Sequence, residues 1–267
     1  MRPSVRNAIV VLMAAIVIVP LVPLVLWSFS DAWPYTSVAP ELGMRAWDQA
    51  LSSRQVVRSA ANSFMLSATV VTISLLLSFF AAKNLGTRRF KGRRLIQLLL
   101  LVPSFIPQIS IVFGMQRVFS RIGLYANFWG LVVALLVFYV PYMTLLLSAV
   151  FENYDLDRER QAATLGVNKV DILFHVTLPA VRGGVIVTCI FGFIGTWSAY
   201  LVTSAIAAPA FKTLPLLLFP MISSGTNGFA FTAAVVIVYI APVLAVLVVF
   251  SRLLVDDATN SKEGAML

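Results

Sequence analysis

Long apolar runs separated by short polar segments dominate the chain. A helix of about 20 apolar residues crosses a bilayer core about 30 Å thick, and it satisfies its own backbone hydrogen bonds in lipid. The pattern therefore predicts an all-α integral membrane protein with six transmembrane helices in a single domain, residues 1–267. The predicted spans lie at about 8–29, 60–82, 95–118, 127–150, 183–206 and 229–253.

The first apolar run has a second interpretation. Arg2 and Arg6 precede it, as basic residues precede the apolar core of a secretory signal peptide. The run is long for such a core and lacks a clear cleavage site of small residues. We therefore expect an uncleaved first span, followed by a polar extramembrane loop at 31–58.

Composition excludes a soluble globule. Hydrophobic residues make up 60% of the chain and charged residues 12%, whereas a soluble domain carries about 25% charged residues. The single cysteine, Cys189, falls inside a predicted span, so the chain cannot form a disulfide within itself.

Positive charges predict the orientation in the membrane. Six Lys and Arg residues fall within 83–94, a density that also occurs in nucleic-acid-binding segments. Because this loop is short and joins two spans, the accumulation of Lys and Arg in cytoplasmic loops explains it more simply. We therefore predict no nucleic-acid partner and cytoplasmic N- and C-termini. Fourteen of the twenty Lys and Arg residues then lie inside: the six of this loop, Arg2, Arg6, Arg158, Arg160, Lys169, Arg182, Arg252 and Lys262.

The connection at 151–182 is cytoplasmic in this topology, and its segment Gln161–Pro179 predicts two short helices separated by a turn. Residues 161–165 are mostly good helix formers, and Gly166 favours a helix end. Apolar residues then recur at three- and four-residue steps over 167–174, and Pro179 is expected to break the second helix before the next span. A short amphipathic element at the membrane edge predicts a partner-binding surface.

This segment resembles the cytoplasmic-loop signature of ABC-importer membrane subunits, which reads E-A-A, three residues, G, nine residues, I-x-L-P. Gln161 stands where the family usually has Glu, and Val176 where it usually has Ile. The resemblance implies a coupling helix seated in a cleft of a separate ATPase subunit. The residues that it assigns to this coupling are Gln161, Ala162, Ala163, Gly166, Val176, Leu178 and Pro179.

The resemblance covers about residues 10–255, including N-S at 62–63, R-F-K-G-R-R at 89–94 and T-L-P at 213–215. It implies the type I, MetI-like importer fold, with the family core at about 60–255. It also implies a multi-pass protein of the bacterial inner membrane that pairs with a second permease subunit as a heterodimer, or with a copy of itself. Two ATPase subunits, which bind ATP and Mg²⁺, and an extracytoplasmic solute-binding protein complete the implied complex, so the chain itself needs no cofactor.

Two branches of that family share features with this sequence. The overall pattern resembles the branch that serves polyamines, phosphonates, ferric iron and thiamine. The W-S-A-Y run at 197–200 is similar to the W-N-x-F of sugar permeases. The resemblance thus leaves a polyamine-like compound, a phosphonate or a sugar as the solute.

The chain carries no evident energy source of its own. No Asp, Glu, Lys or Arg lies in the central part of any predicted span, although ion-coupled carriers usually place such a group there. The phosphate-binding pattern G-x-x-x-x-G-K-[ST] is also absent. Both observations favour a transport subunit driven by a separate ATPase. A self-powered secondary transporter stays as the alternative.

Enzymatic function is less favoured. His175 is the only histidine, and a metal site would need three or four ligands. No G-x-S-x-G nucleophile motif occurs. We therefore predict that the chain is not an enzyme and holds no metal, with an intramembrane enzyme as the weakest alternative.

Polar and aromatic residues within the spans are candidates for a solute path. A buried Gln in a span must find a hydrogen-bond partner or water, because lipid offers none, and residues three apart on a helix share a face. Packing between helices is the other interpretation of the same residues. Prolines 103, 107 and 141 predict kinks. The path candidates are Gln108, Tyr139, Tyr142, Trp197, Ser198 and Tyr200.

Overall fold

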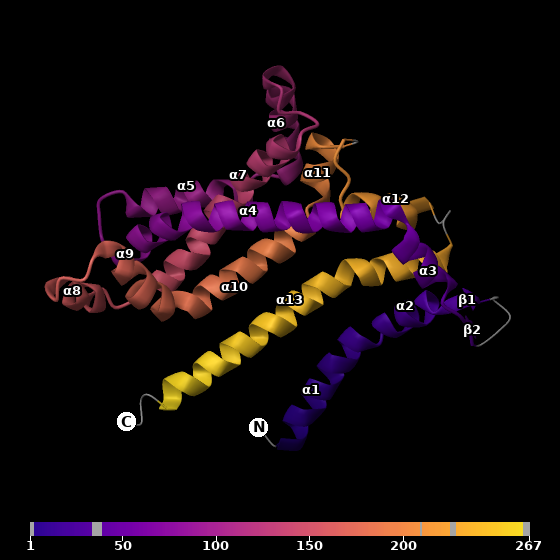
Figure 1. Cartoon of the computed structure of the whole chain (residues 1–267), viewed down its shortest axis with the longest axis horizontal. Coiled ribbons are helices and arrows are strands. Elements are labelled where there is room, and N and C mark those ends of the chain that lie inside the picture. The colour runs from indigo at the N-terminus through magenta and orange to yellow at the C-terminus, as the bar shows by residue number, and fades with distance from the viewer. Residues whose placement is uncertain (1–2, 34–38, 209, 225–227, 264–267) are drawn as a thin grey trace. The chain divides into compact units, whose positions relative to one another are not determined.

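The computed structural model describes residues 3–33, 39–208, 210–224 and 228–263 (Figure 1). Arg2, one of the predicted cytoplasmic charges, lies outside these ranges. The chain divides into two compact units: a larger unit of residues 62–212 and 243–267, and a smaller unit of residues 1–61 and 213–242.

The described chain is mostly helical, as predicted, and four helical stretches are long and apolar enough to cross a membrane. They are α4 (Arg54–Thr87), α7 (Phe128–Glu152), the stretch Lys169–Trp197 and the Phe229–Phe250 part of α13 (Phe229–Glu263). A bent helix pair brings the number to five. These helices agree with predicted spans two to six.

The first predicted span is not one continuous helix. It is divided into α1 (Pro3–Ile18) and α2 (Leu21–Ser28), and Pro20 is the N-cap residue of α2. Pro23 falls in the first turn of α2, where a missing backbone N–H breaks no intrahelical bond. The two prolines therefore explain why this apolar run contains a helix boundary.

The third predicted span is bent into two helices. It consists of α5 (Arg93–Phe105) and α6 (Gln108–Ile122), whose axes differ by 91°. The break falls at Ile106 and Pro107, because proline has no N–H to continue the hydrogen-bond ladder. The kink predicted at Pro107 is confirmed, whereas Pro103 and Pro141 lie inside α5 and α7.

The fifth predicted span begins earlier than expected, and a break after Trp197 interrupts it. Residues Lys169–Trp197 form one helical stretch from α9 (Lys169–Ile172) through the π-helix η1 (Leu173–Thr177) to α10 (Leu178–Trp197). After Ser198 and Ala199 the chain resumes as α11 (Tyr200–Ile206).

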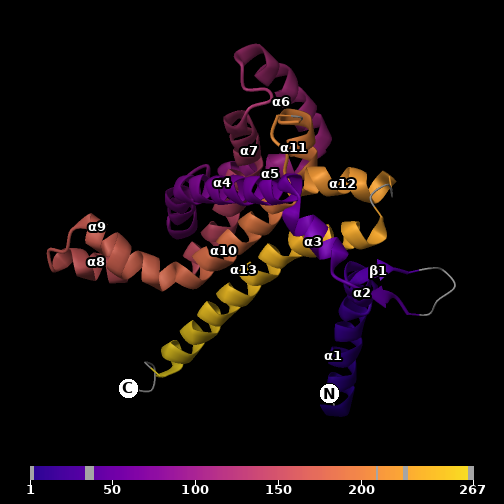
Figure 2. The same cartoon turned by 45° about the vertical axis from the view of Figure 1, so that its right-hand side comes forward.

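In the larger unit, α7 packs against α5, α10 and α11. The α8–α9 hairpin, with α8 at Asp157–Thr164, lies beyond the end where α10 begins, and α6 and α11 lie together where α10 finishes (Figures 1 and 2). A buried core ties α4, α6, α7 and α11 together. Its members include Leu66, Val70, Val112, Leu131, Leu135, Val202 and Ile206.

The smaller unit contains two short strands, β1 (Ser30–Ala32) and β2 (Glu41–Leu42), which pair antiparallel. The loop expected at 31–58 therefore carries a short sheet, and also α3 (Arg45–Ser52) and the start of α4. Trp27 packs on Trp33 and Phe229, with ring centroids 4.8 and 5.3 Å apart. The connection expected at 207–228 contains a helix, α12 (Leu214–Ser224).

Candidate functional site

The predicted helix–turn–helix is present in the 157–177 segment. Helix α8 ends at Thr164, and Gly166 adopts a left-handed backbone with φ +82°. The Gly166 N–H donates to the Ala163 carbonyl at 3.1 Å, and the Val167 N–H to the Ala162 carbonyl at 3.2 Å. This pair of bonds is the Schellman arrangement that ends helices at a glycine. The prediction that Gly166 ends the first helix is confirmed.

The second helix begins two residues later than the apolar pattern indicated, so Val167 lies in the turn. Asn168 is the N-cap of α9, and its Oδ1 accepts hydrogen bonds from the N–H groups of Val170 (2.9 Å) and Asp171 (2.8 Å). Its Nδ2 also donates to the Asp171 carboxylate. An Asn followed three residues later by an acidic residue resembles a capping box, and this signal in the sequence was missed.

Pro179 does not break the helix, contrary to prediction. It lies in the first turn of α10, within the uninterrupted stretch Lys169–Trp197. In a regular α-helix the proline ring would clash with the carbonyl four residues earlier, here that of His175. His175 lies inside the wider π-helical turn η1, and this wider turn explains how the helix continues past the proline.

The predicted coupling residues divide into two groups. Leu178 is partly buried and packs against a cluster that includes Phe79, Phe151 and Val181, so it fixes the loop to the long helices. Gln161, Ala163, Gly166 and Pro179 are exposed, whereas Ala162 and Val176 are half-buried.

Four large apolar side chains of this loop are exposed in the chain by itself. Leu165 is 83% exposed, Val170 62% and Phe174 57%, and Val167 is 39% exposed. Exposed apolar groups on a polar connection mark surfaces that a partner covers. We refer to Leu165, Val170 and Phe174 as the apolar face of the loop.

The match to the E-A-A part of the loop signature needs a correction. Only Thr164 and Leu165 separate Ala163 from Gly166, one residue fewer than the signature requires. Counting back from Gly166 at the signature's spacing puts Arg160 at the Glu position and Gln161 and Ala162 at the two Ala positions. The spacing from Gly166 to Pro179 does agree.

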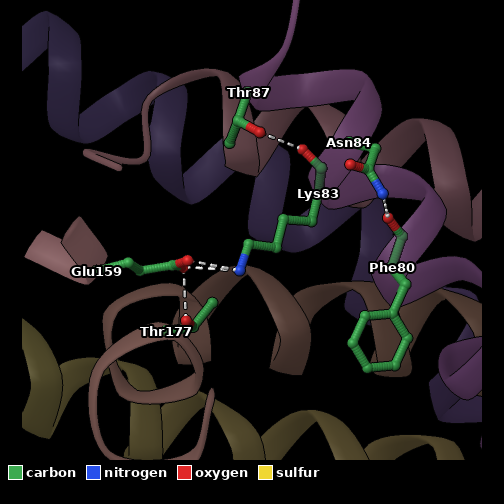
Figure 3. A network of polar contacts seen from close by, with 6 residues as sticks. All are labelled: Phe80, Lys83, Asn84, Thr87, Glu159 and Thr177. Atoms are coloured by element: carbon green, nitrogen blue, oxygen red, sulfur yellow. Dashed lines mark hydrogen bonds and ion pairs between the residues drawn. The ribbon is translucent and has the colours of Figure 1, made fainter. Parts of the chain in front are cut away.

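A charged network links this loop to α4 and was not found from the sequence (Figure 3). The Lys83 ammonium lies 2.8 Å from both carboxylate oxygens of Glu159 on α8, and the Thr177 hydroxyl donates to the same carboxylate at 2.6 Å. The Glu159 and Lys83 side chains are 17% and 24% exposed, and Thr177 is buried. Three elements, α4, α8 and η1, are thus held by one carboxylate.

The environment of Glu159 favours its ionised form. Burial alone would raise its pKa, but Lys83 and the hydroxyls of Thr177 and Tyr154 outweigh burial and hold the pKa below the ordinary 4.5. A carboxylate with a lowered folded-state pKa stabilises the fold above its unfolded pKa, and that stabilisation is lost as pH falls through the folded value.

We expect the Glu159 contribution to be complete at pH 7 and to disappear below pH 4.5. Thermal unfolding of the wild type and Glu159→Gln, followed from pH 7 downwards, measures it as the difference in Tm. That difference should be largest at neutral pH and shrink in acid. A constant difference across the range would contradict the assigned ion pair.

Three of the path candidates line one pocket in the larger unit. The pocket has a volume of about 540 Å³ and lies at the α5–α6 bend. The Tyr139 and Tyr142 rings are perpendicular, with centroids 6.5 Å apart. The lining residues are Pro103, Ser104, Phe105, Ile106, Pro107, Gln108, Phe138, Tyr139, Tyr142, Phe191 and Gly195.

The other three candidates do not line this pocket. Trp197 is 2% exposed and stacks on Phe193 at 5.5 Å. The Ser198 hydroxyl donates to the Ile194 carbonyl. Because α10 ends at Trp197 and α11 begins at Tyr200, these two aromatic residues do not lie on one helix, and their three-residue spacing does not give them a shared face.

Among the described residues, no group of three His, Cys, Asp or Glu side chains is placed to hold a metal ion. His175 is exposed, and its Nδ1 lies 3.1 Å from the Asp171 carbonyl oxygen. The described part of the chain thus offers long helices, a loop with an exposed apolar face and an uncharged pocket.

Comparison with known proteins gives consistent results. A family model described as "Binding-protein-dependent transport system inner membrane component" matches residues 74–258. The chain is 28% identical over 216 residues to the sulfoquinovosyl glycerol transport system permease protein SmoH of Agrobacterium fabrum (79% of this chain, 74% of that one). It is 22% identical over 242 residues to the spermidine/putrescine transport system permease protein PotC of Haemophilus influenzae (91% and 94%).

Solved structures share the fold. One is the crystal structure of a bacterial ABC transporter involved in the import of the acidic polysaccharide alginate, with a TM-score of 0.74, 18% identity and coverage of 93% of this chain and 95% of that one. Another is an inward-facing MetNI methionine ABC transporter, with a TM-score of 0.57, 15% identity and coverage of 79% and 97%.

Proposed function

Because the chain belongs to the family of binding-protein-dependent transport system inner membrane components, and is thus a permease subunit of an ABC importer, we propose that its 151–182 loop couples solute movement to a separate ATPase. The subunit is a transport component of the membrane and not an enzyme. The loop would seat its apolar face in the ATPase, with Gln161, Ala162, Ala163 and Gly166 at the contact.

The observation that carries this proposal is the exposure of Leu165, Val170 and Phe174 around a glycine-capped turn. Desolvating such side chains contributes about 25 cal/mol per Å² of buried apolar surface, so a cleft that covers them gains affinity. Through this contact the ATPase would supply the energy for transport, for which the predicted spans carry no charged coupling group of their own.

The network around Glu159 suggests how movement of the loop reaches the long helices. Glu159 binds Lys83 of α4, and Thr177 joins the loop to the stretch that continues as α10. ATP-driven closure of an ATPase dimer would displace the loop, and with it α4 and α10. This mechanism requires two conformations that ATP distinguishes.

The rest of the assembly is proposed by analogy with the family. We propose two ATPase subunits that bind ATP and Mg²⁺, a second permease subunit in a heterodimer, and an extracytoplasmic solute-binding protein. In this arrangement the 151–182 loop and both chain termini lie in the cytoplasm, residues 1–267 act as one permease domain, and Gln108, Tyr139 and Tyr142 line the solute path.

The test is reconstitution of the complex in proteoliposomes. We expect the ATPase subunits to co-purify with a tagged chain, and uptake to require ATP and the solute-binding protein. Uptake by this chain alone, driven by a proton or sodium gradient, would instead favour a secondary transporter.

A second prediction concerns the bend at Pro107. Pro107→Ala restores an N–H where α5 and α6 separate, so the two helices should realign and the pocket wall should move. We expect uptake to fall by about 2- to 30-fold, the range for coupling changes of about 0.5–2 kcal/mol. Uptake and solute-stimulated ATP hydrolysis are the measurements.

Pro141→Ala is the matched control, because Pro141 lies within α7, where the helix is not broken, and does not line the pocket. It should retain most of the uptake. Equal uptake by Pro107→Ala and wild type, with equal ATP hydrolysis, would show that the bend has no part in transport.

A further inference from the structure

We propose that the pocket at the α5–α6 bend binds an uncharged, polyhydroxylated solute of the sugar or polyol class, and not a polyamine or a phosphonate. This inference rests on the proposed transport function and identifies the chemical class of its solute. It is carried by the side chains and backbone groups that line the pocket.

Charge excludes the ionic solutes. None of the described residues that line the pocket is charged. In the sequence, no Asp or Glu occurs between Asp48 and Glu152, or between Asp171 and Asp256. The ammonium groups of a polyamine would find no carboxylate among the residues that line this pocket to offset any hydration they lost, and one cation–π contact returns only about 0.5–2 kcal/mol.

The same reasoning applies to anions. The segments that line the pocket contain no Lys or Arg, since the sequence has none between Arg94 and Arg117, Arg121 and Arg158, or Arg182 and Lys212. A phosphonate would therefore find no cationic partner along these segments. An uncharged solute loses far less on desolvation.

The polar groups that do line the pocket suit hydroxyl groups. Gln108 offers both a donor and an acceptor, and Tyr139 and Tyr142 offer phenolic hydroxyls. Helix ends leave backbone groups without intrahelical partners, so the bend can add some as well, although the Val102 carbonyl and the Ser110 N–H already have partners at 3.3 and 3.0 Å. A sugar hydroxyl both donates and accepts, so it can pair with either kind of group.

The apolar groups suit the C–H faces of a sugar ring. Phe105, Phe138 and Phe191 line the pocket together with the two perpendicular tyrosine rings. Mostly apolar walls with a few placed polar groups are typical of small-molecule sites, and the volume of about 540 Å³ falls within their usual range of about 300–1,000 Å³.

Because Gly195 has no side chain, it leaves the space that the Tyr139 ring occupies. A Cβ atom on Gly195 would lie 2.6 Å from the Tyr139 hydroxyl oxygen and 2.8 Å from a ring carbon. Because these distances are too short, any larger residue there would displace the ring. Gly195→Ala is therefore a variant that alters the pocket without removing a polar group.

The experiment measures direct binding to the detergent-solubilised importer, with its partner subunits and without the solute-binding protein. Equilibrium dialysis with labelled glycerol, glucose and lactose tests uncharged probes of increasing size. Spermidine is the cationic probe and glucose 6-phosphate the anionic one. At least one uncharged probe should bind about tenfold more tightly than either ion, as expected when one or two hydrogen bonds and no ion pair form.

Variants then locate the binding. Gln108→Ala and Tyr139→Phe should each weaken the uncharged probe by about three- to tenfold, the effect of losing one hydrogen bond. Gln116→Ala is the matched control, because Gln116 lies on the same helix and does not line the pocket. Its affinity should equal that of the wild type. Gly195→Ala should weaken all the uncharged probes together.

The inference is overturned if no uncharged probe binds, if spermidine or glucose 6-phosphate binds as tightly, or if Gln108→Ala and Tyr139→Phe bind like Gln116→Ala. Each of these results leaves the transport function standing if the same complex, reconstituted in proteoliposomes with the solute-binding protein, shows ATP-dependent uptake. Absence of both the ATPase subunits and any ATP-dependent uptake would contradict the proposed function itself.

Discussion

Gly166→Asp should lower ATP-driven uptake by about tenfold or more and reduce the amount of ATPase that co-purifies. Gly166 has φ +82°, a region that costs a residue with a Cβ about 1–2 kcal/mol, and 1.4 kcal/mol corresponds to a factor of ten. Apart from its two chain neighbours, a Cβ there meets no atom of the described residues within 4 Å. The damage should therefore fall on the shape of the turn and on the partner that covers it.

Gly123→Asp is the matched control for this prediction. Gly123 ends α6, has φ +74° and also has open space around a Cβ, so its substitution adds a similar backbone strain outside the loop. It should leave ATPase co-purification unchanged. Gly166→Ala separates the strain from the added charge and should give an intermediate loss. The proposal fails if Gly166→Asp complexes keep their ATPase and import at the wild-type rate.

Glu159→Gln should uncouple ATP hydrolysis from transport. The substitution removes the charge that pairs with Lys83 but keeps a side chain able to accept the Thr177 hydroxyl. Since both partners are half-buried, the loss should be near the upper end for exposed pairs, about 1 kcal/mol. We expect about fivefold less solute imported per ATP hydrolysed, with the ATPase still bound, because the apolar face of the loop is unchanged.

The structure offers a control of the same chemistry. Asp157 pairs with Arg160 at 2.7 Å on the same helix, with side chains 66% and 74% exposed, so Asp157→Asn should import normally. The exchange Lys83→Glu with Glu159→Lys should recover part of the coupling if the pair acts through its charge. Equal losses in Asp157→Asn and Glu159→Gln would indicate a general effect of charge on the loop.

The hydropathy pattern was sufficient to predict the long helices. In α4 and α7 every intrahelical hydrogen bond is local, so about twenty apolar residues determine both the element and its class. The glycine turn was predictable for the same reason, since a left-handed residue is a local requirement. The break at Pro107 was visible in the sequence as a kink, although its 91° angle was not.

The ion pair of Lys83 and Glu159 was not predictable in the same way. Its members are 76 residues apart, and the sequence placed Lys83 in a basic loop, whereas it lies within α4. Leu178 and Trp197 show the same limit. Leu178 belongs to the loop signature and Trp197 to an apolar span, and neither pattern shows which side chains lie beside these residues in the fold. In the structure both residues pack against other side chains.

The stretch Lys169–Trp197 has a consequence for energetics. At 1.5 Å per residue its 29 residues measure about 44 Å, and this one rod carries Phe174 of the loop at one end and Phe191 and Gly195 of the pocket near the other. If solute in the pocket biases the rod's position, thermodynamic reciprocity demands that it change the loop's hold on the ATPase by the same factor. Solute binding in the pocket and ATPase binding at the loop would then be coupled through one continuous helical stretch.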